Sequence, residues 1–212
     1  MNIEAMKRLA IVALIAVVAI MLPTSATAQI NLSNLLGGGS KTTTSSANDP
    51  YKRLADAAPA ASTLNATWLY DTASFSYLGS NALAEMAVAQ LNPVINDVLR
   101  QMGVTKGSAV LMLSSGTGSI THDGYTMKGS YSYTRSTAGI VAETIVDDKR
   151  VSASGYVRYS SDTLTVLLDA RELIKAILEV MPEYKNDPNI VLVETVLRDL
   201  GDVYVMGKFK RK

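Results

Sequence analysis

A single histidine, His122, is the first side chain in the sequence that could act in acid–base chemistry. As a general base it would need a nearby serine to activate and an acid to orient it. The chain has no Gly-x-Ser-x-Gly elbow that would present such a serine. His122 also directly precedes the pair Asp123-Gly124, where turns favour polar side chains. The sequence therefore favours a turn residue over a catalytic base.

Two further motifs match known ligand sites only in part. Residues 114–119, Ser-Ser-Gly-Thr-Gly-Ser, lack the lysine and the spacing of a P-loop and carry two of the three glycines of a dinucleotide fingerprint. The adjacent acids Asp147 and Asp148 are followed by Lys149 and Arg150, whereas paired glycosidase acids face each other across a cleft. We interpret both motifs as hairpin turns, so the protein is predicted to be non-enzymatic, with no catalytic residue.

Composition excludes several classes of site. The chain has no cysteine and one histidine, which excludes disulfides, thiolate zinc sites and any site that needs two imidazoles. We therefore expect no metal and no cofactor. Lys plus Arg number 20 and Asp plus Glu number 19, so the chain lacks the basic footprint of a nucleic-acid-binding protein.

Tyrosine is the residue type whose number is least expected, with ten tyrosines against two phenylalanines. Tyr125, Tyr131 and Tyr133 share one face of a predicted strand, and Tyr159 lies on the inward face of another. In a hollow barrel these four would line a pocket with apolar rings and hydroxyl groups, and they are our candidate ligand-binding residues. The alternative is that the tyrosines simply fill the interior, because eight-stranded barrels are often only wide enough for side chains.

Basic residues gather at the C-terminus, at Lys208, Lys210, Arg211 and Lys212. Alternation places Lys208 and Lys210 on the side of the strand opposite Phe209. They could contact phosphates or an acidic membrane surface. The simpler interpretation is an edge or terminal strand kept soluble by charge.

Residues 1–28 have the three-part pattern of a secretory signal peptide. Lys7 and Arg8 precede an uncharged apolar stretch over 9–22, and Ala26-Thr27-Ala28 supplies the small residues of a cleavage site before Gln29. The stretch is shorter than the ~20 residues that span a bilayer, so we expect no transmembrane span after cleavage. The protein is expected to be exported, to the periplasm, the outer membrane or the medium of a Gram-negative bacterium.

Residues 29–62 are predicted to be a flexible leader or tether. Gly37-Gly38-Gly39 and the Ser/Thr-rich run 40–46 cannot bury enough apolar surface to offset their ordering entropy. A docking or spacer segment is the alternative, and 51–61 has the pattern of a short helix. The folded domain is expected over 63–212.

From residue 63 the pattern predicts an α+β fold. Two strands at 66–70 and 73–78 precede one helical insertion, which Pro93 should kink or split. About six strands joined by tight turns follow, then two helices that begin at Asp169 and Asp187, and a last strand at 203–209. Such strands pair antiparallel with their chain neighbours. We expect a mainly antiparallel meander sheet, curled into a barrel or half-barrel, whose last strand pairs beside Trp68.

Distinctive strand and helix junctions occur along this domain at Thr67–Tyr70, Phe75–Ala84, Leu99–Gly103, Leu164–Ala170 and Met206–Lys210. In these junctions the chain resembles a known family, the exported lipocalin-like domain common in Gram-negative gut anaerobes. The resemblance covers roughly 63–212. It implies a lipocalin-like barrel, export to the cell envelope and no established activity, and it supplies no functional residues. The family is characterised by an Asp-Gly-Thr-Phe type hairpin; Asp123-Gly124-Tyr125-Thr126 keeps the turn and changes the aromatic residue.

These observations lead to two functional hypotheses. In the first, a non-enzymatic envelope protein binds a small apolar or amphipathic ligand in a barrel pocket lined by the tyrosine face and the inner faces of the helices. In the second, a structural or adaptor module has a filled core and acts through its surface, with protein partners that the sequence does not identify. An apolar cavity of roughly 300 Å³ or more would distinguish the first from the second.

Overall fold

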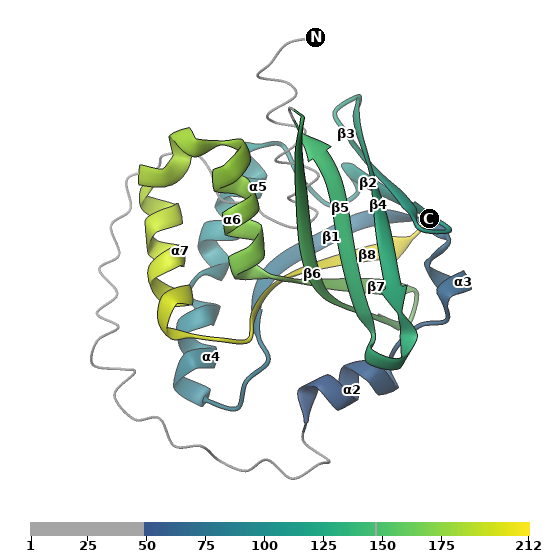
Figure 1. Ribbon diagram of the computed structural model, residues 1–212, viewed down its shortest axis with the longest axis horizontal. Coiled ribbons are helices and arrows are strands. Elements are labelled where there is room, and N and C mark those ends of the chain that lie inside the picture. The colour runs from purple at the N-terminus through teal and green to yellow at the C-terminus, as the bar shows by residue number, and fades with distance from the viewer. Residues whose placement is uncertain (1–48, 147) are drawn as a thin grey trace.

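Eight antiparallel strands close into a barrel in the computed structural model, which describes residues 49–146 and 148–212 (Figure 1). The strands are β1 (Ala66–Tyr77), β2 (Ala109–Ser114), β3 (Thr117–His122), β4 (Tyr125–Thr134), β5 (Gly139–Val146), β6 (Lys149–Ser160), β7 (Thr163–Asp169) and β8 (Val203–Arg211). Each strand pairs with the next in the chain, and β8 pairs with β1. The meander barrel predicted from the sequence is confirmed, and it is closed.

The seam between β1 and β8 completes the barrel. Trp68 lies opposite Arg211 at one end of this ladder, and Tyr77 lies opposite Val203 at the other. The last strand therefore pairs beside Trp68, as predicted. Because β8 also pairs with β7, it is not an edge strand, and its lysines need another explanation than edge protection.

The two strands predicted at 66–70 and 73–78 are one continuous strand. The register of β1 against β8 shifts between Tyr70 and Thr72, which marks a β-bulge at Asp71. A bulge adds one residue to a strand without ending it. The extra residue is the reason that the sequence pattern breaks at this point, and Trp68, Tyr70, Ala73 and Phe75 are all buried as a result.

Three hairpin turns have two consecutive residues with positive φ, as tight hairpins require. They are Ser115-Gly116 between β2 and β3, Asp123-Gly124 between β3 and β4, and Ser161-Asp162 between β6 and β7. All three lie where the sequence predicts turns. Asp148 also has positive φ, at the β5–β6 turn, whereas Asp147 lies outside the described residues.

Four helices stand together on one side of the barrel, at the end from which β1 and β7 leave (Figure 1). The first insertion is split at Pro93 into α4 (Ala82–Ala89) and α5 (Asn92–Gln101), as predicted. The second contains α6 (Ala170–Val180), the 3₁₀ turn η4 (Pro182–Asn186) and α7 (Pro188–Asp199). Asp169 and Asp187 accept hydrogen bonds from the first-turn amides of α6 and α7, which confirms both predicted caps.

Residues 49–62, which the sequence analysis assigned to the leader, contain α2 (Pro50–Asp56) and the start of α3 (Ala61–Leu64). Helix α2 packs on the outer wall of the barrel, where Tyr51 and Leu54 contact a cluster on β6, β7 and β8. The short 3₁₀ turn η3 (Arg135–Thr137), between β4 and β5, lies beside it. The signal-peptide and tether predictions for residues 1–48 concern a part of the chain outside the described residues.

Candidate functional site

Aromatic side chains fill one end of the barrel. Trp68 is fully buried and its indole N–H donates to the carbonyl oxygen of Leu64, 3.1 Å away. Its ring meets Tyr159 edge-on with centroids 6.0 Å apart, and Tyr70 meets Phe209 in the same way at 6.0 Å. Leu64 of α3 is itself fully buried against this group. This end is a packed plug of aromatic rings.

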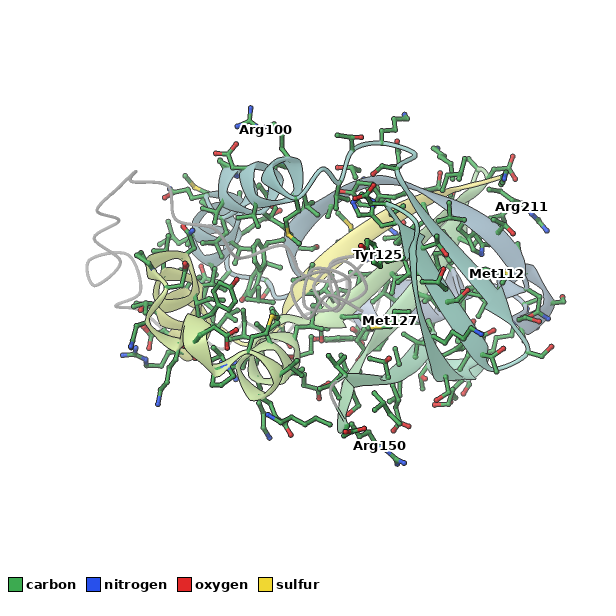
Figure 2. The ribbon with its side chains drawn as sticks, turned by 90° about the horizontal axis from the view of Figure 1, so that it is seen from above. Arg100, Met112, Tyr125, Met127, Arg150 and Arg211 are labelled. Carbon is green, nitrogen blue, oxygen red and sulfur yellow. The ribbon has the colours of Figure 1, made fainter. Side chains whose placement is uncertain are left out.

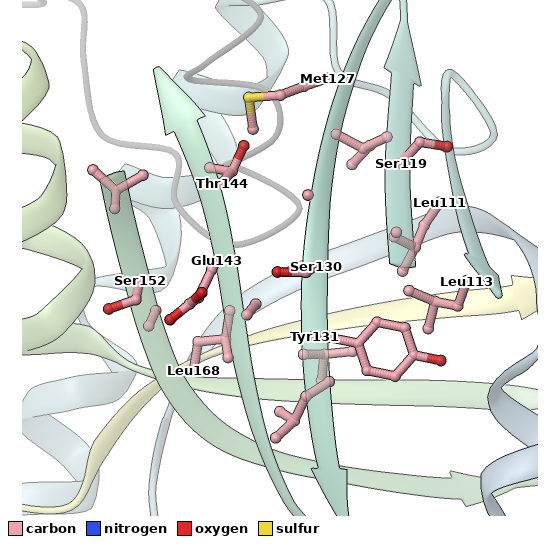
Figure 3. A pocket seen from close by; sticks show the side chains of 18 of the residues that line it. Leu111, Leu113, Ser119, Met127, Ser130, Tyr131, Glu143, Thr144, Ser152 and Leu168 are labelled. Atoms are coloured by element: carbon pink, nitrogen blue, oxygen red, sulfur yellow. The ribbon is translucent and has the colours of Figure 1, made fainter. Parts of the chain in front are cut away.

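A cavity of about 150 Å³ lies between this plug and helix α6 (Figure 3). Its walls are formed by residues of β2 to β8 and of α6, most of them at inward-facing positions. Most of them are aliphatic, and Tyr131 and Leu113 lie side by side in the wall. The aliphatic members include Leu111, Leu113, Ile120, Ile140, Val151, Val166 and Leu168. The interior is therefore filled at one end and hollow at the other.

The hollow exists because small residues face each other across adjacent strands. Gly118 of β3 pairs with Gly129 of β4, and Ala142 of β5 pairs with Ala153 of β6. All four line the cavity. Glycine is also required at position 129 for a second reason, since a Cβ there would lie 2.4 Å from the carbonyl oxygen of Glu143. The two small pairs leave the space that larger side chains fill at the plugged end.

Helix α6 covers the hollow end with Leu173 and Ala176. Its position is fixed by hydrogen bonds to the barrel rim: Glu172 Oε2 accepts from the Ser154 amide at 2.5 Å, and Lys149 Nζ donates to the Glu179 carbonyl oxygen at 2.6 Å. Met127 and Thr144 lie at the upper end of the cavity in Figure 3. Seen from above, Tyr125 and Met127 lie near the middle of the molecule, whereas Arg100, Arg150 and Arg211 lie at its periphery (Figure 2).

Of the four candidate tyrosines, the structure places Tyr131 in the cavity wall. Its half-buried side chain packs against the core, and its hydroxyl makes no hydrogen bond with the described residues. The Thr144 hydroxyl, which also lines the cavity, donates to the Lys128 carbonyl oxygen at 2.9 Å. Tyr131 therefore supplies a phenolic hydroxyl that can bond to a bound molecule.

The structure does not bring the other three tyrosines to the cavity. Tyr133 donates to the Pro59 carbonyl oxygen at 2.7 Å, and burial raises the pKa of its phenol. Tyr159 belongs to the plug and donates to Asp162 Oδ1 at 2.8 Å. Tyr125 is 40% exposed at the start of β4. The hydroxyls of Tyr133 and Tyr159 hold chain segments at the barrel ends.

His122 lies directly before the Asp123-Gly124 turn, but its side chain is only 8% exposed. Its Nδ1 lies 3.1 Å from the Ser108 carbonyl oxygen and its Nε2 lies 3.4 Å from that of Met102. His122 therefore stands at the predicted turn, and alternation along β3 directs its side chain toward the interior. His122 links the end of β3 to the loop that follows α5.

The described residues supply few groups for other chemistry. In residues 49–146 and 148–212, no three His, Asp or Glu side chains gather as metal ligands would. The cavity wall includes Lys128 and Glu143, whose side chains are exposed on outward-facing positions of β4 and β5. What the arrangement can do is enclose an apolar group and offer it the Tyr131 hydroxyl.

Alkaline pH is expected to destabilise the barrel through Tyr70 and Tyr204. Burial is the main cause that raises the pKa of each phenol from the ordinary 10.0 to about 12. The phenols of the unfolded chain ionise first. The contribution of the neutral phenols to stability is therefore complete below about pH 10 and is lost as the pH rises toward about 12. The urea midpoint, measured by circular dichroism, should fall between about pH 9 and about pH 11.

Single substitutions separate this effect from general alkaline damage. Tyr70→Phe removes one of the phenols whose pKa burial raises and should make the fall smaller. Tyr125→Phe, at an exposed position, should leave it unchanged. An identical fall in the Tyr70→Phe variant would contradict the prediction.

Comparison with known proteins identifies the family. A family model described as Lipocalin-like domain (DUF4923) matches residues 41–211. The chain belongs to this family of lipocalin-like domains. The comparisons with curated proteins and with solved structures gave no match. None of the helices formed by the described residues has the length and apolar character needed to cross a membrane.

Proposed function

We propose that this lipocalin-like domain binds the apolar part of a small apolar or amphipathic molecule in the cavity beneath α6. The proposal rests on two cross-strand pairs of small residues, Gly118–Gly129 and Ala142–Ala153. These pairs leave a space walled by aliphatic side chains. A binding site for a small molecule combines such walls with a few polar groups. The Tyr131 hydroxyl is the polar group on offer.

The size of the cavity limits the ligand. A volume of about 150 Å³ is below the ~300 Å³ at which pockets for drug-sized molecules begin. Apolar cavities of roughly 150 Å³ accept a benzene-sized molecule. The cavity therefore suits one aromatic ring or the end of an alkyl chain, with the remainder of a longer ligand outside the barrel.

Straight-chain alcohols from butanol to decanol test this proposal. Each methylene that enters the cavity should strengthen binding by about 0.8 kcal/mol, or about 4-fold in Kd. Once the space is full, further methylenes should add little, so affinity should rise along the series and then level off. Isothermal titration calorimetry of the purified protein measures this profile.

Ala142→Leu supplies the matching variant, because position 142 faces the cavity opposite Tyr131. The larger leucine side chain should occupy the cavity, so the affinity should no longer rise with the length of the alcohol. Val141→Leu, at the outward-facing neighbour on the same strand, should leave it unchanged. Equal binding by Ala142→Leu and the unmodified protein would refute the cavity as the site. The absence of any chain-length dependence would favour the second candidate, a structural or adaptor module, which the filled end of the barrel supports.

We also propose that the protein acts in the envelope of a Gram-negative bacterium or outside the cell. The signal-peptide pattern of residues 1–28 is its support. Mass spectrometry of the protein purified from its own host tests it. A mature chain that starts at Gln29 supports export, and an intact N-terminus in a cytoplasmic fraction contradicts it.

A further inference from the structure

A groove of about 490 Å³ lies on the outer wall of the barrel, separate from the interior cavity. Its floor is formed by β6, β7 and β8, and Ala57, just beyond the last residue of α2, forms part of its rim. The neighbouring part of the same wall is covered by α2, through the cluster of Leu54, Leu167 and Tyr204. The groove is the part of this wall that α2 leaves open.

Two cross-strand rows of polar side chains make up the floor of the groove. In the first, Thr165 of β7 lies between Arg158 of β6 and Lys208 of β8. In the second, Thr163 lies between Ser160 and Lys210. Neighbouring strands are ~4.8 Å apart, so the cations of the first row stand about 10 Å apart at their Cα atoms, on either side of Thr165. Their long side chains can converge on one small group above that threonine.

The charges in the groove are unbalanced. Arg158, Lys208 and Lys210 bring three cations together on one face of the sheet, where like charges repel each other. Asp71 is the one acid in the lining, and it already pairs with Lys106 at 2.7 Å. None of the three groove cations takes part in an ion pair within the described residues.

Hydroxyl groups lie among these cations. Thr165 is only 4% exposed although its position faces outward, because the flanking side chains enclose it. Lys210 Nζ donates to Thr163 Oγ1 at 2.6 Å, so this ammonium is held over the floor. Three cations with neighbouring hydroxyl donors match a group with several negatively charged oxygens.

We propose that the groove binds a phosphate-type oxyanion through Arg158, Lys208 and Lys210. The three cations neutralise its charge, and the hydroxyls of Ser160 and Thr165 supply further donors, whereas the Thr163 hydroxyl donates to the Ser161 carbonyl oxygen at 3.4 Å. The oxyanion is either free in solution or the phosphate of a lipid headgroup. The experiment has one arm for each source.

Inorganic phosphate is the probe in the first arm. Its binding is followed by backbone amide shifts in NMR spectra at constant ionic strength, with sodium chloride as the compensating salt. We expect saturable shifts in β6, β7 and β8. The combined variant Arg158→Gln, Lys208→Gln, Lys210→Gln should bind at least about 10-fold more weakly. The matched control Lys175→Gln, Lys185→Gln, Arg198→Gln removes the same charge from exposed positions on the helical side and should bind as the unmodified protein does.

Vesicles are the probe in the second arm. Flotation with phosphatidylcholine vesicles that contain phosphatidylglycerol is compared with flotation with pure phosphatidylcholine. Flotation that needs the anionic lipid and is lost in the groove variant assigns the site to a headgroup. Saturable phosphate binding without flotation assigns it to a free oxyanion. The proposal is overturned if neither probe binds, or if the control variant weakens binding as much as the groove variant. Alcohol binding in the interior cavity is measured separately, so the two proposals fail independently.

Discussion

Gly155→Ala is expected to prevent the barrel from closing. An added Cβ at position 155 would lie 1.8 Å from the Leu167 carbonyl oxygen and 2.8 Å from the Leu168 Cα. Both are backbone atoms of the paired strand β7, which cannot move aside without breaking the β6–β7 ladder. We expect a loss of at least about 4 kcal/mol in the free energy of unfolding, a large share of the roughly 5–15 kcal/mol that a domain has. Urea unfolding followed by circular dichroism measures it.

Gly201→Ala is the matched control. A Cβ at position 201 meets no atom within 4 Å, so the same chemical change should have little effect. A Gly155→Ala variant whose urea midpoint equals that of Gly201→Ala would show that β6 and β7 can separate locally. The position matters for the site as well, since Gly155 pairs with Leu168, immediately before the chain turns into α6. The close approach of β6 and β7 therefore helps to fix the position at which α6, the helix that covers the cavity, begins.

Trp68→Ala is expected to cause the second large loss. The ring is fully buried between Leu64 and Tyr159, with the Arg211 guanidinium 5.9 Å from the ring centroid. Truncation of a buried tryptophan costs about 3–5 kcal/mol, and the bond to the Leu64 carbonyl adds about 1 kcal/mol. Because this bond holds α3 against the barrel end, proteolysis should also cut near residues 59–64 sooner than in the unmodified protein.

Trp68→Phe divides the effect into its parts. Phenylalanine keeps an aromatic ring in the plug but has no N–H to donate, so we expect a loss nearer to 2 kcal/mol, estimated as roughly the hydrogen bond plus a smaller packing term. Equal losses in the two variants would mean that the hydrogen bond, and not the packed ring, holds the barrel end together. Urea unfolding monitored by circular dichroism suits both variants, because fluorescence would lose its one tryptophan.

Much of the fold could be predicted because its signals are local. The split at Pro93, the cap at Asp187 before Pro188 and the turn at Asp123-Gly124 each depend on a few adjacent residues. Alternation along a strand is equally local, and it placed Tyr131 inward and Lys210 outward correctly. The prediction of two separate strands around Asp71 was wrong, because a β-bulge and a turn interrupt the alternation of inward and outward residues in the same way.

The site could be predicted only in part, because it depends on register. Gly118 and Gly129 leave a hollow only where β3 and β4 pair in the observed alignment, and the same holds for Ala142 and Ala153. Small residues at inward positions of four successive strands were the available signal. His122 shows the same limit, because its burial depends on the loop at Met102 and Ser108, far from it in sequence.

The β1–β8 seam also sets an order of events during biosynthesis. Its two strands are the first and the last of the barrel, so the ribosome has delivered seven strands before Phe209 can pair with Tyr70. Until then β1 and β7 each expose a row of unpaired backbone groups, which invites pairing with other chains. Pairing over so long a separation is slow. A cell that makes this protein must therefore keep an incomplete sheet from aggregating until the final strand arrives.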